Sequence, residues 1–184
     1  MSVHSNCRHG MDKEMNSDRN QSAATTAQPK LSPDMERLSF FLGTWHAADK
    51  YEKTAFNPNG GKGKGVYKTV IGPGGFSLLT DYEYEAPHGR SNGHYILAWD
   101  SRQRCYMGSM VSSSFPGCLS VTANWEDTTL VLTGEFEARG KKVAFRQTFT
   151  DITPARMVLR QYNSIDGAPS QLFGTTVFTK EENR

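Results

Sequence analysis

The spacing of hydrophobic residues along the chain changes at one glycine, Gly43. Upstream of it, Leu38 and Phe41 follow the three-to-four-residue spacing of a helix that buries one face. Ser32 can cap the start of this helix and Pro33 suits its first position, because the first N–H groups of a helix have no partner within it. The pattern therefore predicts a helix of two or three turns that ends at Gly43.

Downstream of Gly43 the hydrophobic spacing becomes two, and segments with this alternation follow one another, separated by glycine, proline, asparagine or aspartate. The predicted strands cover residues 44–54, 65–71, 76–86, 91–100, 104–112, 117–124, 128–138, 141–150, 156–164 and 169–180. No long helix separates them, so we expect an antiparallel meander that closes on itself and leaves no exposed edge. The sequence therefore predicts an all-β fold over residues 31–181, an antiparallel up-and-down barrel of about ten strands, with the short helix capping one end.

Residues 1–30 form a polar leader with almost no large aliphatic side chains. Such a composition cannot bury enough apolar surface to offset the entropy of ordering, so we expect the leader to be disordered. His4, Cys7 and His9 resemble metal ligands, but we attribute their presence in this segment to chance and predict no metal site.

The turn at Arg139-Gly140 allows the register of one hairpin to be worked out. Two-residue turns of this kind close tight hairpins, so Ala138 is expected to face Lys141. The pairs that follow are Phe136 with Val143, Gly134 with Phe145, Leu132 with Gln147, and Leu130 with Phe149. These residues form one mainly apolar face, which we predict lines the inside of the barrel.

The next strand adds amide side chains to this inner face. The same alternation, carried through the following turn, places inside the barrel Met157, Leu159, Gln161 and Asn163. Together with Gln147, the inner face then carries three amides, which a fully packed core seldom contains. The amides either line a ligand cavity or bond to one another and to buried water, and both interpretations stay open.

The charge balance argues against two kinds of partner. The chain carries 21 lysine and arginine residues against 19 aspartate and glutamate residues, a net charge of +2, so no strong field favours nucleic acid. No apolar stretch approaches the ~20 residues needed to cross a bilayer, so no membrane partner is expected. The glycine-rich run 60–65 precedes a strand and lacks the helix terminus that binds phosphate, so we predict a mobile loop at the barrel rim.

The cysteines bear on the cellular compartment. Cys7, Cys105 and Cys118 lack any metal-ligand spacing. A disulfide between Cys105 and Cys118 would form if the strands brought them together. The odd number of cysteines and the lack of a signal peptide favour free thiols instead, and hence a cytoplasmic protein.

The candidate acid–base residues belong to two neighbouring predicted strands. His94 can titrate near neutral pH, and Tyr82 or Asp81 would be its partner if these side chains entered the barrel. The turn between the strands could instead give an inner face formed by Tyr82, Tyr84, Tyr95, Leu97 and Trp99. That alternative turns His94 outward, and the sequence leaves both orientations open.

Three short motifs carry a resemblance to known proteins. They are 38–45 (LSFFLGTW), 71–76 (IGPGGF) and 93–100 (GHYILAWD). A short helix that leads into Gly43-Thr44-Trp45 resembles the opening of the lipocalins and fatty-acid-binding proteins, the calycins. Over residues 33–180 the chain looks more closely like an uncharacterised bacterial lipocalin-like family, a domain of unknown function. The resemblance implies that Trp45 plugs the closed end of the barrel and that Gly43 lets the backbone turn in closely.

The chain departs from the calycin pattern in two places. Lipocalins pair the tryptophan with an arginine of the last strand, but residues 171–180 contain none, so Arg146 or Arg160 would have to substitute. The related haem-binding nitrobindin group uses a histidine ligand near the C-terminus. No histidine follows His94 in this chain, so we expect neither haem nor another cofactor.

Two functions compete on this basis. The first is a binding barrel for a small, largely apolar ligand, whose polar contacts would come from Tyr82, Tyr95, Gln147, Gln161 and Asn163. The second is a small isomerase- or hydrolase-like enzyme that uses His94 with Tyr82 or Asp81 as acid and base. We favour binding, because the sequence offers a cavity but no activated nucleophile or metal set. A barrel with a filled interior is the third alternative, and a homodimer is compatible with each of them.

Overall fold

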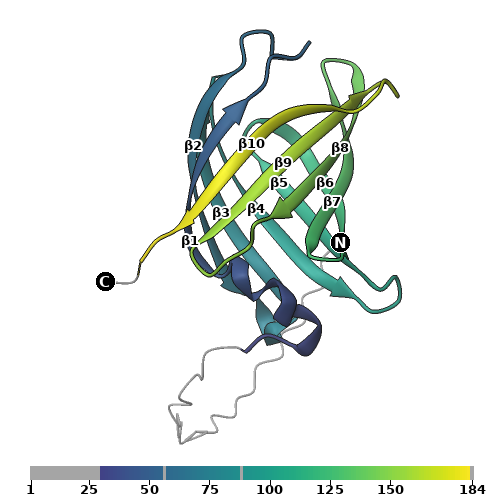
Figure 1. Ribbon diagram of the computed structural model, residues 1–184. Helices are drawn as coiled ribbons and strands as arrows, with labels where there is room; N and C mark the ends of the chain where they lie inside the picture. The colour runs from purple at the N-terminus through teal and green to yellow at the C-terminus, as the bar shows by residue number, and fades with distance from the viewer. Residues whose placement is uncertain (1–29, 56, 88, 183–184) are drawn as a thin grey trace, which may run out of the picture.

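The computed structural model describes residues 30–55, 57–87 and 89–182, which form one closed barrel of antiparallel strands (Figure 1). The strands are β1 (Gly43–Tyr51), β2 (Gly61–Ile71), β3 (Ser77–Ala86), β4 (Gly89–Asp100), β5 (Cys105–Ser112), β6 (Phe115–Glu126), β7 (Thr129–Ala138), β8 (Lys141–Thr150), β9 (Arg156–Ile165) and β10 (Gln171–Lys180). Each strand pairs with its neighbours in sequence, and β10 pairs back with β1. This confirms the predicted all-β up-and-down barrel. The disordered leader predicted for residues 1–30 falls, apart from Lys30, outside the described residues.

A short helix, η1 (Pro33–Phe41), lies across one end of the barrel (Figure 1). It is a 3₁₀-helix of nine residues, so its three residues per turn bring Met35, Leu38 and Phe41 onto one side. Met35 and Leu38 are fully buried against the barrel core. The side chain of Ser32 makes no capping bond, contrary to expectation; its backbone carbonyl accepts bonds from the amides of Met35 and Glu36. No helix of the described part of the chain is long and apolar enough to span a membrane.

Trp45 closes the core at the η1 end, as predicted. Its side chain is 1 % exposed, and its indole Nε1 donates a hydrogen bond to the Phe41 carbonyl at 3.0 Å. Gly43 holds a φ of +99°, which only glycine adopts without strain, and so lets the chain pass directly from η1 into β1. The Nζ of Lys180 lies 5.2 Å from the centre of the Trp45 ring, at cation–π distance.

The cation beside Trp45 therefore comes from a lysine of the last strand. The expectation that Arg146 or Arg160 takes this place is wrong. Arg146 forms an ion pair with Glu126 at 2.6 Å, and Arg160 donates to the hydroxyl of Thr150 at 3.0 Å. Both arginines have outward-facing positions in the register of β8 and β9, so neither side chain reaches the core.

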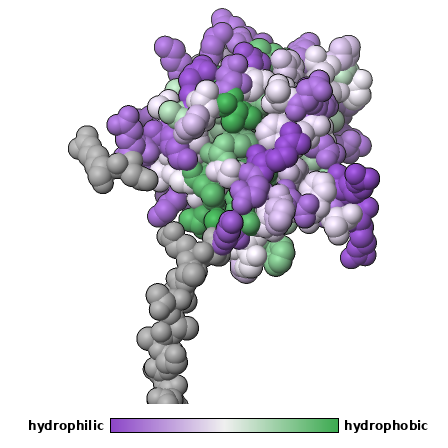
Figure 2. Space-filling view, turned by 60° about the horizontal axis from the view of Figure 1, so that its bottom comes forward, coloured by the Kyte–Doolittle hydropathy of each residue, from purple (hydrophilic) through white to green (hydrophobic). Residues whose placement is uncertain are grey.

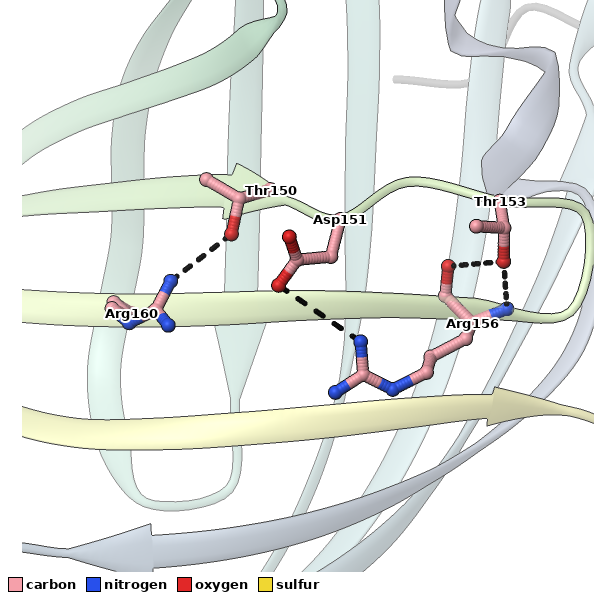
Figure 3. A network of polar contacts seen from close by, with 5 residues as sticks. All are labelled: Thr150, Asp151, Thr153, Arg156 and Arg160. Carbon is pink, nitrogen blue, oxygen red and sulfur yellow. Dashed lines mark hydrogen bonds and ion pairs between the residues drawn. The ribbon is translucent and has the colours of Figure 1, made fainter.

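Polar contacts on the outside of the barrel tie together the β8–β9 turn (Figure 3). The hydroxyl of Thr153 accepts a bond from the Arg156 amide at 2.9 Å and donates to the Arg156 carbonyl at 3.1 Å. Asp151 lies 3.9 Å from the Arg156 guanidinium. These contacts fix the turn that sets the inner register of β9.

The predicted register of the β7–β8 hairpin is confirmed. Ala138 lies opposite Lys141, and the pairs down to Leu130 with Phe149 are those expected from a two-residue turn. Across the next hairpin, Gln147 faces Gln161 and Phe145 faces Asn163, so these amides do share the inner face.

The structure decides two further expectations, the loop at residues 60–65 and the state of the cysteines. The predicted loop at residues 60–65 is wrong, because β2 begins at Gly61 and pairs with β1 as far as Tyr51. Of the two cysteine alternatives, free thiols are found: Cys105 is buried and Cys118 is exposed. They lie on neighbouring strands but well apart along them, since Tyr106 pairs with Ala123 and Met110 with Leu119.

Some hydrophobic side chains also gather on the outer surface. Figure 2 shows such a group on the face seen from the η1 end. The exposed large hydrophobic residues are Val66, Val70, Phe76, Ile96 and Val111. They belong to β2, β4, β5 and the β2–β3 connection, so the outer face of this part of the sheet is not uniformly polar.

Candidate functional site

The inner faces of β1 and β9 change in exposure from one end of the barrel to the other. On β1, Trp45 and Ala47 are buried, whereas Asp49 is half-buried although it faces the same way. On β9, Met157 is buried, and Gln161 and every later inner residue are half-buried. On these two strands the inner side chains are therefore more exposed toward the end opposite η1, whereas the inner residues Ala86, Ser91 and Val143 of that end are buried. We call the half-buried, inner-facing side chains of this end and their buried neighbour Tyr82 the cup.

Stacked tyrosines form one wall of the cup. The rings of Tyr67 and Tyr82 lie 5.6 Å apart at 22°, and those of Tyr82 and Tyr84 lie 6.0 Å apart at 18°. Glycines opposite them leave room for the rings: a Cβ atom at Gly93 would lie 2.5 Å from the Tyr82 hydroxyl, and one at Gly65 would lie 3.0 Å from Tyr84. Small residues on one strand thus accommodate large polar aromatics on the next.

Two tyrosine hydroxyls of this wall, those of Tyr67 and Tyr82, are neutral groups at physiological pH. Burial raises the pKa of Tyr67 far above its ordinary value, and the nearby carboxylate of Asp49 raises it further. Burial also raises the pKa of Tyr82, although a hydrogen bond with Ser112 partly offsets this effect. Each phenol can therefore donate and accept hydrogen bonds within the cup.

Asp49 is the acidic side chain of the cup. Its Oδ1 accepts a hydrogen bond from the Thr176 hydroxyl at 2.5 Å, and it also accepts one from the Tyr51 hydroxyl. Burial raises the pKa of Asp49 above its ordinary value, and these two hydrogen bonds partly counter the rise. Burial and the neighbouring carboxylate raise the pKa of Tyr51 in turn.

The three predicted amides form a chain on the opposite wall. Gln147 Nε2 donates to Gln161 Oε1 at 2.9 Å, and Gln161 Nε2 donates to Asn163 Oδ1 at 3.0 Å. Of the two interpretations left open by the sequence, the bonding of the amides to one another is found, and all three amides are half-buried. One end of the chain presents the Gln147 carbonyl oxygen, and the other presents the Asn163 amide nitrogen.

Tyr95 lies deeper, beneath the cup. Its hydroxyl is buried and has no hydrogen-bond partner among the residues that the structure describes. A Cβ atom at Gly108 would lie 2.7 Å from this oxygen, so the phenol fits over that glycine. Burial raises the pKa of Tyr95, which keeps the hydroxyl neutral.

The structure separates the three acid–base candidates. His94 Nδ1 and Asp81 Oδ1 lie 2.6 Å apart, but their side chains are 71 % and 73 % exposed on the outer surface. Tyr82 faces inward, opposite Gly93. Strands β3 and β4 are joined through a two-residue turn that pairs Ala86 with Gly89, and this register turns His94 outward. The expected histidine–tyrosine pair inside the barrel is therefore not formed.

Sequence reasoning missed three members of the cup: Asp49, Tyr51 and Tyr67. The signal was present, because alternation from the inward-facing Trp45 leads to Asp49 and Tyr51 on the same strand. Tyr67 lies directly opposite Trp45 in the β1–β2 register. Tyr67 lies within the predicted strand 65–71, but the inner side of that strand could not be assigned, because residues 60–65 were expected to form a loop and the pairing with β1 was therefore unknown.

Comparison with known proteins supports the fold. No family model and no curated protein matches the sequence. The crystal structure of Rv2717c from M. tuberculosis has a TM-score of 0.60 and 16 % identity, with 83 % of this chain and 100 % of that chain covered. The S-type phycobiliprotein lyase CPES from Guillardia theta has a TM-score of 0.52 and 14 % identity, with 80 % and 94 % covered. The chain thus shares its fold with these two structures.

Proposed function

We propose that the protein binds a small, largely apolar molecule in the cup. The observation that carries this proposal is the change along the strands from buried to solvent-accessible inner side chains, seen on both β1 and β9. The accessible part combines aromatic rings with a few hydrogen-bonding groups, the combination that is typical of small-molecule sites. The closed end beneath it supplies a rigid floor of large apolar side chains.

The polar contacts to such a ligand would come from both walls. On one side, the hydroxyls of the tyrosine stack, which includes Tyr82, can donate or accept. On the other side, the amide chain ends in the Gln147 carbonyl and the Asn163 amide, while Gln161 holds both neighbours in place. The buried hydroxyl of Tyr95 adds an unpaired donor below.

The enzymatic alternative has no such support. The exposed His94–Asp81 pair lies on the opposite face of the sheet from Tyr82, so the three side chains cannot act on one bound molecule. We therefore assign them no catalytic role.

A fluorescence titration of the full chain tests binding in the cup. We expect N-phenyl-1-naphthylamine, a neutral apolar fluorophore, to bind saturably with a blue-shifted emission. Gln161→Trp should fill the cup and weaken binding by about tenfold or more, because the indole displaces the probe. Tyr162→Trp places the same side chain one position along on the outer face and should leave affinity within about twofold.

Two results would count against the proposal. One is the absence of saturable binding by the unmodified protein, together with native mass spectra that show no retained small molecule. The other is an equal loss of affinity in both tryptophan variants, which would place the probe outside the cup.

A further inference from the structure

The cup has an unbalanced negative charge. Asp49 is the one acidic side chain that faces inward on the ten strands, all of which lie within the described residues. None of the ion pairs in the described part of the chain involves it. Two lysines hold inner positions. Lys180 is opposite Trp45, four residues or about 13 Å along β1, and lies over the tryptophan ring. Lys141, at the rim, forms an ion pair with Asp166 at 3.0 Å. A half-buried carboxylate without a cation is unfavourable unless a ligand supplies one.

The carboxylate of Asp49 is held in a fixed orientation with one side uncovered. The Thr176 hydroxyl, from β10, and the Tyr51 hydroxyl both donate to it. On the β2 side it faces Gly63, where a Cβ atom would lie 3.0 Å from Asp49 Oδ2 and 3.0 Å from the Tyr51 ring. The glycine keeps this side of the carboxylate free of a covering side chain.

Aromatic side chains lie beside this position. The Tyr51 ring shares the space over Gly63 with Asp49, and two positions along β2 a Cβ atom at Gly65 would lie 3.2 Å from the Tyr67 ring and 3.0 Å from Tyr84. The charge of Asp49 contributes to the raised pKa of both Tyr51 and Tyr67. Phenol rings attract cations through the negative potential of their faces. A single carboxylate does not suffice for a metal ion, and no group of metal-ligating residues is found in the described ranges. A carboxylate among aromatic rings instead matches an organic ammonium group.

We propose that the cup selects a small organic amine, whose ammonium group pairs with Asp49 and lies against the rings of Tyr51, Tyr67 and Tyr84. The inference rests on the proposed function, since it names the class of ligand that the cup takes. The apolar part of the amine then lies toward the floor of the barrel, and the amide chain faces it from the other wall.

A displacement experiment tests the preference for an amine. The full chain is loaded with N-phenyl-1-naphthylamine at pH 7.5, and three indoles of similar size compete with the probe. Tryptamine carries an ammonium group, tryptophol a neutral hydroxyl, and indole-3-acetate a carboxylate. We expect tryptamine to displace the probe at a concentration about tenfold lower than tryptophol, and indole-3-acetate to be the weakest. Asp49→Asn should reduce the preference for tryptamine over tryptophol to within about twofold.

Glu83→Gln is the matched control, because it removes the same charge from an outward-facing position on β3. It should keep the tenfold preference for the amine. Four results would each overturn the inference while the proposed function stands. Three concern the unmodified protein: equal displacement by tryptamine and tryptophol, best displacement by indole-3-acetate, or no displacement of a bound probe by any of the three. The fourth is an unchanged preference for tryptamine in Asp49→Asn. If the unmodified protein does not bind the probe at all, the proposed function fails, and this inference fails with it.

Discussion

The two ends of the barrel use the same backbone pattern for different purposes. At the η1 end, the inner positions carry large apolar side chains such as Trp45, Leu78 and Leu130, all fully buried. At the other end, the inner positions of the same strands carry tyrosines, amides and Asp49, and most of them are half-buried. The closed end packs its large apolar side chains into one cluster, and the far half carries polar groups that a packed core would exclude.

Under the proposed function, this comparison assigns stability to the closed end of the barrel and binding to the cup. Substitutions at the closed end should change the free energy of unfolding strongly. Substitutions in the cup should change it little and act mainly on the ligand.

Trp45→Ala is the change with the largest expected effect. Removing the buried indole leaves a cavity beneath η1 and takes away the cation–π contact with Lys180, so we expect a loss of about 3–5 kcal/mol in the free energy of unfolding. Urea denaturation followed by circular dichroism measures this. His46→Ala changes the neighbouring outward-facing residue and should stay within about 0.5 kcal/mol. A loss below about 1 kcal/mol for Trp45→Ala would show that the closed end does not anchor the fold.

Gly93→Ala tests where the tightly packed half ends. Gly93 lies beside the Tyr82 ring, and an added Cβ atom would lie 2.1 Å from the Val111 carbonyl and 2.5 Å from the Tyr82 hydroxyl. Backbone and ring must both move, so we expect a loss of about 1–3 kcal/mol, measured by the same denaturation. Asn92→Ala, on the exposed face of β4, is the control and should be neutral. A neutral Gly93→Ala would show that the packing around Tyr82 is as loose as in the rest of the cup.

The sequence predicted which residues face inward in the parts of the barrel where a turn or a large side chain fixes the alternation. The Arg139-Gly140 turn determined the β7–β8 register, and Trp45 marked the closed end. The phase of β4 stayed open, because Tyr95, Ile96 and Leu97 form a continuous apolar run and Ile96 is exposed in the structure. Only the pairing with β3 decides which of them face inward.

The cup was harder to predict than the fold, for a physical reason. The first half of β2 alternates lysine with glycine, so it carries no apolar signal, and its glycines are required by tyrosines on other strands. Likewise, the bond between Asp49 and Thr176 joins the first strand to the last. Such contacts depend on the closure of the barrel, which local sequence patterns do not describe.

Asp49→Asn has the smallest expected effect on the free energy of unfolding. Unlike the two variants above, it should raise this free energy. Because burial raises the pKa of Asp49, the neutral form suits the folded state, and this advantage is lost as the pH rises through the folded-state pKa. The titratable groups facing it, Tyr51, Tyr67 and Tyr84, are phenols, so they bring no positive charge to offset its ionisation. We therefore expect the variant to be slightly more stable than the unmodified protein at pH 7.

The pH dependence makes this prediction specific. The gain should vanish in denaturation experiments at about pH 3 or below, where aspartate is largely protonated in both states. Glu83→Gln, exposed on β3, should show no such pH-dependent gain. A variant that is less stable than the unmodified protein at pH 7 would mean that the hydrogen bonds from Thr176 and Tyr51 outweigh the desolvation of the carboxylate.

The seam between β1 and β10 has a consequence for how the protein is made. The ribosome produces β1 first, yet the strand that covers one of its edges is the last to emerge. Hairpins such as β7–β8 can pair as soon as they leave the exit tunnel, whereas ring closure waits for the end of translation. Until then the nascent sheet has two bare edges, and a chain interrupted before β10 keeps them permanently. We therefore expect cellular quality control to act mainly on incomplete chains of this protein, whose exposed sheet edges are prone to aggregation.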